Sequence, residues 1–134
     1  MGGRKIKLIA GMKKNELFSI KARLSSFKYA IDGILKLFST EHNSLLHLLA
    51  TIVTFILVIV LQVSKIEIAA LVIVIGLVWL AEMFNTAIEK IMDFITVKQD
   101  SRIRYIKNVS AAAVFVSAIV ALITGCIVFI PKLL

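Results

Sequence analysis

Three long apolar segments constrain this chain more than any other feature of its sequence. They cover about residues 44–63, 66–95 and 109–130, and the second becomes polar in its last third. About 20 consecutive apolar residues are enough for an α-helix to cross a bilayer. With 60% hydrophobic residues and a mean hydropathy of +0.97, the chain is also more apolar than a soluble domain of its size. We therefore predict an all-α membrane protein with three transmembrane helices.

The region ahead of the first apolar segment divides into two parts. Residues 1–16 read as a basic flexible leader, and residues 17–134 as a single membrane domain. Within residues 17–39, apolar side chains recur at helical spacing, and basic residues lie away from that stripe. The stripe consists of Ile20, Leu24, Phe27, Ile31, Ile34 and Phe38. This pattern predicts an N-terminal amphipathic helix on the membrane surface.

Positive charge is distributed very unevenly. The net charge is +8; nine of the sixteen Lys and Arg residues precede Glu41, and five more lie from Lys90 to Lys107. Only Lys65 and Lys132 lie elsewhere. By the positive-inside rule, the N-terminus and the polar loop predicted over 96–107 face the cytoplasm. In a chain this apolar, the basic residues indicate anionic lipid head groups as partners, and no nucleic acid.

The polar end of the second apolar segment carries an acidic stripe. Glu82, Asn85, Glu89 and Asp93 are spaced three, four and four residues apart, which places them on one face of a helix. Aligned carboxylates repel one another unless a cation lies among them, and a divalent metal with a nucleotide phosphate meets that need. The alternative is a solvated helix end in which Glu89 pairs with Lys90 or another neighbour.

The predicted topology gathers further charges around this stripe. Glu41, before the first span, and Lys107, before the third, fall on the same cytoplasmic side as Glu82. Carboxylates with a lysine at a membrane surface suit phosphoryl transfer from a nucleotide to a lipid hydroxyl. The sequence contains no Walker A loop, no G-x-G-x-x-G and no kinase-type H-R-D motif, which excludes the soluble nucleotide-binding folds.

The same residues carry a resemblance to a known family. The pattern Glu82-x-x-Asn85-Thr-Ala-Ile-Glu89-x-x-x-Asp93, followed by Lys107 and an Ala-rich third span, resembles the small integral-membrane diacylglycerol kinases of bacteria, which include the undecaprenol kinases. The Glu41-x-Asn43-x-x-x-His47 pattern is similar to theirs as well. The likeness covers roughly residues 27–131.

This resemblance implies an ATP-dependent, Mg²⁺-requiring lipid kinase in the bacterial inner membrane. It implies a homotrimeric bundle with sites shared between subunits and an active site on the cytoplasmic face. The resemblance implies that Glu82 is the general base, and that Glu41 and Glu89 bind Mg²⁺ and contact the nucleotide. It implies that Asn85 orients the reacting groups and that Lys107 contacts the phosphates. Tyr29 would border the nucleotide, and Asp93 would support the site. Asn108 occupies a nucleotide-binding position where the family usually has an acid, so the chain departs from the family there.

Three residues in or next to the spans, His42, His47 and Trp79, are also interpreted from their own chemistry. His42 and His47 are five residues apart with no cysteine nearby, so a polar role between helices is favoured over a metal site for them. Trp79 is predicted to anchor the second span at the membrane interface.

Two other functions are compatible with a small membrane protein. A non-catalytic scaffold or regulatory subunit would use its acids only to pair with basic residues. An ion or proton carrier would need acids deep within the spans, and residues 48–61, 68–81 and 111–130 contain none. The lipid kinase is therefore the main hypothesis, with diacylglycerol and undecaprenol as its candidate substrates.

Overall fold

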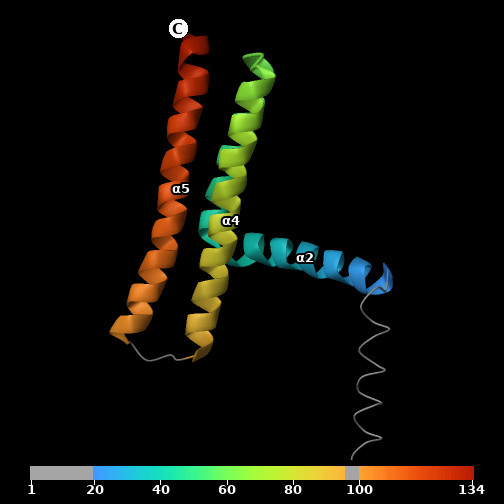
Figure 1. Cartoon of the computed structure of the whole chain (residues 1–134), viewed down its shortest axis with the longest axis vertical. Helices are drawn as coiled ribbons and strands as arrows, with labels where there is room; N and C mark the ends of the chain where they lie inside the picture. The colour runs from blue at the N-terminus through green and yellow to red at the C-terminus, as the bar shows by residue number, and fades with distance from the viewer. Residues whose placement is uncertain (1–19, 96–99) are drawn as a thin grey trace, which may run out of the picture. The chain divides into compact units, whose positions relative to one another are not determined.

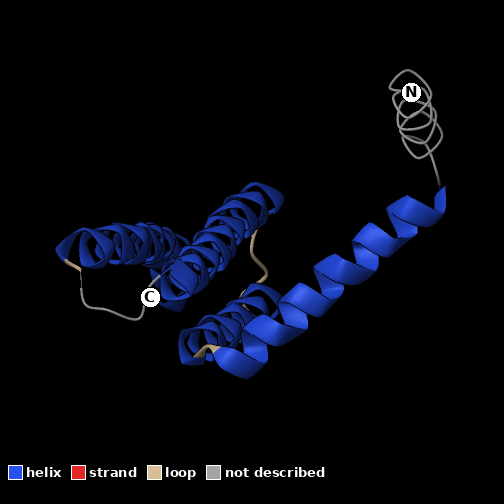
Figure 2. Ribbon diagram, turned by 90° about the horizontal axis from the view of Figure 1, so that it is seen from below, coloured by secondary structure: helices blue, strands red, loops and turns tan. Residues whose placement is uncertain are grey.

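The computed structural model describes residues 20–95 and 100–134, and all secondary structure in these ranges is helical (Figures 1 and 2). The helices are α2 (Ile20–Thr40), α3 (His42–Val60), α4 (Lys65–Ile95) and α5 (Ser101–Leu133). The predicted all-α fold class is confirmed. The chain forms two compact units, residues 1–39 and 40–134, which are described separately. The predicted basic leader, 1–16, lies outside the described residues.

Helix α2 supplies most of the described part of the first unit. A helix was predicted over 17–39, and the described helix covers Ile20–Thr40. Side chains of the predicted apolar stripe are largely exposed, at 64% for Leu24, 70% for Phe27 and 57% for Ile31. Such a stripe is what a helix lying in a membrane interface requires, and the surface location of α2 remains a prediction.

The second unit contains three helices that are long and apolar enough to cross a membrane. Together they confirm the prediction of a multi-pass membrane protein. Helix α4 has 31 residues, which corresponds to a length of about 46 Å. Since the hydrocarbon core of a bilayer is only about 30 Å thick, α4 extends well beyond it. Its acidic stripe can therefore reach the edge of the hydrocarbon without a break in the helix.

The connection between α3 and α4 is a tight turn. Gln62 adopts a left-handed conformation with φ 48°, which reverses the chain just after α3. The backbone N–H of Ser64 donates to Glu67 Oε2 at 2.8 Å, and the N–H of Glu67 donates to Ser64 Oγ at 3.4 Å. This reciprocal pair is a capping box, which satisfies two backbone donors at the start of α4.

The prediction of a loop over 96–107 is wrong from Ser101 onward, because α5 begins there. Residues 96–99 of this predicted loop lie outside the described residues. Asp100 explains the start of α5: its carboxylate caps the helix by accepting the backbone N–H of Arg102 at 2.8 Å. The Arg102 guanidinium also donates to Asp100 Oδ2 at 3.0 Å. The polar residues after Asp100 therefore form the first turns of a helix. Pro131, taken as the end of the third span, lies in the last turn of α5, which continues to Leu133.

Helix α4 is the central element of the second unit. It packs most extensively on α5 and less on α3 (Figure 1). At one end of the bundle, Leu71 of α4 joins Val128 and Phe129 of α5 in a small apolar cluster. An ion pair between Glu67 and Lys132, 3.2 Å apart, closes that end. The opposite end holds the acidic stripe.

We expect replacement of Asp100 by Ala to fray the first turn of α5, because the N–H of Arg102 loses its acceptor. Hydrogen bonding to Arg102 lowers the pKa of Asp100, so the cap is effective above the ordinary pKa of an aspartate and is lost as the pH falls through the lowered folded value. Hydrogen exchange of the amides of residues 102–104 would be faster in Asp100→Ala and near normal in Asp100→Asn, which keeps an acceptor. Equal exchange in all three proteins would refute the cap.

Candidate active site

Glu82, in the middle helix α4, is the most deeply buried ionisable residue among those described. Its side chain is 2% exposed, and its Oε2 atom has no hydrogen-bond partner among the described residues. A buried carboxylate without partners is costly in an apolar environment. Such a side chain is therefore a candidate for a functional role.

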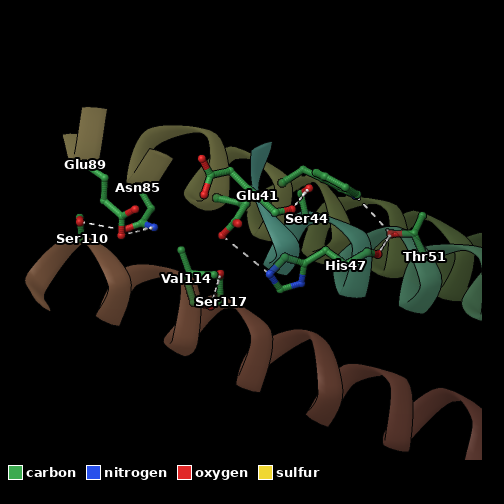
Figure 3. Close-up of polar contacts among 11 residues, drawn as sticks. Glu41, Ser44, His47, Thr51, Asn85, Glu89, Ser110, Val114 and Ser117 are labelled. Carbon is green, nitrogen blue, oxygen red and sulfur yellow. Dashed lines mark hydrogen bonds and ion pairs between the residues drawn. The ribbon is translucent and has the colours of Figure 1, made fainter. Parts of the chain in front are cut away.

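His47 of α3 faces this carboxylate. Its Nε2 atom is 3.9 Å from Glu82 Oε2, a distance in the range of an ion pair but too long for a hydrogen bond (Figure 3). The imidazole packs edge-on against the indole of Trp79, with ring centroids 6.2 Å apart. The indole N–H of Trp79 donates to Thr51 Oγ1 at 3.2 Å, and the Thr51 hydroxyl donates to the His47 carbonyl at 2.7 Å. Through these contacts, His47 and Thr51 of α3 pack against Trp79 of α4.

A chain of hydrogen bonds joins α5 to the acidic stripe. The Ser110 hydroxyl donates to Asn85 Oδ1 at 2.7 Å, and Asn85 Nδ2 donates to Glu89 Oε1 at 3.3 Å (Figure 3). Because Asn85 Oδ1 accepts the hydrogen bond from Ser110, the amide NH₂ of Asn85 faces Glu89. Asn85 is 8% exposed, so it shares a buried face of α4 with Glu82. The predicted common face of Glu82, Asn85 and Glu89 is thus present.

Glu41 joins the site from the residue before α3. Its carboxylate accepts from Lys90 Nζ at 2.9 Å, and this hydrogen bond lowers the pKa of Glu41 below its ordinary value. Both Glu41 and Glu89 are close enough to Glu82 to interact with it electrostatically. Lys90, which the sequence suggested as a partner of Glu89, pairs with Glu41.

The remaining predicted residues are placed less centrally. Lys107, expected at phosphates, forms an ion pair of 2.6 Å with Asp93. Asn108 is exposed next to Lys107 on α5. Tyr29 belongs to the first unit, where its side chain is 71% exposed. One chain therefore brings Glu41, Glu82, Asn85, Glu89, Asp93 and Lys107 to a single end of the bundle.

Carboxylates rather than histidines are the metal-ligand candidates in this arrangement. Within residues 20–95 and 100–134, no group of three or more His, Cys, Asp and Glu side chains is arranged to hold a metal. The predicted Mg²⁺ site needs only two protein ligands, because nucleotide phosphates and water complete the shell of this ion. Glu41 and Glu89 are hard oxygen donors at the same end of the bundle, so their chemistry fits this ion.

An apolar cavity of about 480 Å³ extends between α3, α4 and α5. His47 and Trp79 line one part of it, and Phe129 and Ile130 line another. His47 therefore borders the cavity and also faces the Glu82 carboxylate.

Three contacts of the site were not predicted from the sequence. They are the pairing of His47 with Glu82, the bond from Ser110 to Asn85, and the ion pair of Lys90 with Glu41. Ser110 lies in the Ala-rich third span, where a small residue also fits close packing of helices. A polar side chain inside an apolar segment is the available signal for such contacts, but it does not identify the partner.

Comparison with known proteins identifies the family of this chain. The family model described as prokaryotic diacylglycerol kinase matches residues 28–129. The undecaprenol kinase of Bacillus subtilis (strain 168) is 35% identical over 108 residues, which cover 81% of this chain and 88% of that protein. The diacylglycerol kinase of Synechocystis sp. (strain PCC 6803) is 31% identical over 125 residues, covering 92% of this chain and 71% of that protein. The chain therefore belongs to the prokaryotic diacylglycerol kinase family.

Proposed function

We propose that this chain transfers the γ-phosphoryl group of ATP to the hydroxyl of a membrane lipid, with undecaprenol and diacylglycerol as candidate acceptors. Membership of the family supports a lipid kinase, and neither relative favours a non-catalytic scaffold. The observation that carries the mechanism is the buried Glu82 carboxylate, which has an unpartnered oxygen among the described residues and faces His47, a residue that lines an apolar cavity. A lipid has the matching shape, because it carries a hydroxyl at the end of a hydrocarbon chain.

Glu82 acts as the general base. Its carboxylate accepts the proton of the lipid hydroxyl while the lipid oxygen forms a bond to the γ-phosphorus. The bond from that phosphorus to the oxygen bridging the β-phosphate breaks, and ADP leaves with this oxygen. Burial removes water that would compete with the lipid as acceptor.

Glu41 and Glu89 would hold Mg²⁺ together with the ATP phosphates. When bound, this ion neutralises charge on the phosphate oxygens. Asn85, fixed by Ser110, keeps its amide directed at Glu89 and so orients that carboxylate. Lys90 and Lys107, which now pair with Glu41 and Asp93, supply positive charge for the phosphates at the same end.

The active enzyme is proposed to be a homotrimer in the bacterial inner membrane. Large apolar side chains along the spans are exposed in the single chain, among them Ile59, Phe115 and Ile127 at 77%, 67% and 68%. Lipid and neighbouring copies are the two surroundings that such residues fit. The positive-inside rule places the site at the cytoplasmic face.

We expect Glu82→Gln to remove nearly all lipid phosphorylation while the protein remains folded. The amide keeps the shape of the side chain but cannot accept the proton, and loss of a general base costs on the order of a hundred-fold or more. Rates of ³²P transfer from ATP to each lipid would be measured beside a thermal melt in detergent. Glu67→Gln, at the other end of the same helix, is the matched control and should keep its rate. A Glu82→Gln variant with most of its activity would rule out the base assignment.

We expect Glu41→Gln and Glu89→Gln each to raise the Mg²⁺ concentration needed for half-maximal rate, by about ten-fold, because one hard anionic ligand is lost. A Mg²⁺ titration of both variants at fixed ATP checks this, again with Glu67→Gln as control. If the acids serve only as ion-pair partners, the melting temperature will fall and the Mg²⁺ requirement will stay unchanged.

We expect opposite ends of α5 to lie on opposite sides of the membrane. In a Cys126→Ala background, Arg104→Cys should be protected from a membrane-impermeant thiol reagent in intact cells, and Lys132→Cys should be labelled. Permeabilised cells, in which both positions should react, provide the control. Labelling at position 104 from outside would reverse the proposed topology.

A further inference from the structure

The contact between His47 and Glu82 has no role in the function proposed so far. Among the described residues, Glu82 Oε2 is the buried side-chain atom without a hydrogen-bond partner. The Nε2 atom of His47, a possible donor, is 3.9 Å from it. Catalytic hydrogen bonds are often long before substrate binds and shorten in the substrate complex. A shift of about 1 Å would make this contact a hydrogen bond.

The ring of His47 lies between Trp79 and the apolar cavity. It packs on the indole of Trp79, with ring centroids 6.2 Å apart, and it also lines the cavity. A hydrocarbon chain in the cavity would therefore contact the imidazole that faces the proposed base.

We propose that His47 is a positioning residue for Glu82: its Nε2–H donates to Glu82 Oε2 and leaves the other carboxylate oxygen to receive the proton of the lipid hydroxyl. The inference rests on the proposed function. It assigns His47 the tautomer, or the protonated form, that carries a hydrogen on Nε2.

Electrostatics around Glu82 support the same assignment. The titratable groups that act on it are His47 from α3, Glu41 from the residue before α3, and Glu89 from α4 itself; among the described residues, α5 contributes none. A hydrogen bond donated to a carboxylate stabilises its ionised form, which is the form that accepts a proton.

The test compares three variants of His47 in the full-length protein, in lipid–detergent micelles with Mg·ATP. His47→Gln places an amide donor near the position of Nε2, His47→Asn places its donor near the position of Nδ1, and His47→Leu provides no donor. His47→Asn and His47→Leu should lower kcat by about ten- to a hundred-fold, since small displacements of reacting groups have effects of this size. The KM of these two variants for Mg·ATP should stay within about two-fold of the wild-type value, because His47 is not one of the proposed nucleotide ligands. His47→Gln should retain most of kcat.

The pH dependence separates positioning from packing. Without a donor at Oε2 the ionised form of Glu82 is less stable, so the acidic limb of the kcat profile should move to higher pH in the Asn and Leu variants. His42→Leu, which removes the other and exposed histidine at the start of α3, is the matched control and should leave that limb in place. His47→Gln should keep the acidic limb of the kcat profile at the pH found for the wild-type protein.

Equal losses of kcat in the Gln, Asn and Leu variants, with an unchanged acidic limb, would show that His47 only packs and would overturn the inference. If His47→Leu fails to give a folded protein by thermal melt, the comparison of Gln with Asn decides the question. A wild-type protein that phosphorylates neither lipid would overturn the proposed function and this inference together. An active wild type with unaltered His47 variants would overturn the inference alone.

Discussion

The burial of one carboxylate between membrane-spanning helices is the constraint on which the rest of the site depends. Glu82 is 2% exposed in a bundle whose other interior side chains are mostly apolar. An ionised carboxylate in such a place needs compensating groups, or it destabilises the fold. The polar side chains around it are best understood as that compensation: His47 from α3, and the Ser110–Asn85–Glu89 chain that ties α5 to α4.

The ion pairs show how the same end of the bundle tolerates several acids. Glu41 pairs with Lys90, and Asp93 pairs with Lys107. Each pair joins segments that are distant in sequence, so the charges hold the helices together at this end as well as balancing one another. Among the described residues, Glu82 has no lysine or arginine partner, and this difference sets it apart chemically from its neighbours. A buried acid that faces only a histidine, which itself lines an apolar cavity, has the features expected of a base for a lipid hydroxyl.

Much of this could be predicted from the sequence, because periodicity and hydropathy determine how a single helix is arranged. The spacing of Glu82, Asn85 and Glu89 fixes their common face, and the apolar lengths fix the number of spans. The polar residues after Asp100 misled the prediction, because a polar stretch fits a loop and a solvated helix end equally well. The Asp100 cap decides between them, and its hydrogen bond becomes visible only in three dimensions.

The contacts between helices could not be predicted in the same way. A sequence shows that His47 is polar in an apolar segment, but not that it meets Glu82, because the rotation of α3 against α4 depends on packing along both helices. The Ser110–Asn85 bond has the same origin: a small residue in an Ala-rich span serves close packing and hydrogen bonding equally well. The spacing of residues predicts which side chains share a face of one helix. Which side chain of another helix they contact depends on how the helices pack in the assembled bundle.

The most direct test of the account is the fate of the γ-phosphoryl group. Purified protein would be incubated with [γ-³²P]ATP and Mg²⁺, with undecaprenol and with diacylglycerol in parallel, and label would be counted in the lipid and in inorganic phosphate. The account predicts that label enters at least one lipid and that little appears as inorganic phosphate, because the proposed base is shielded from water. Label that accumulates only as inorganic phosphate, or that stays in ATP with both lipids, would contradict it.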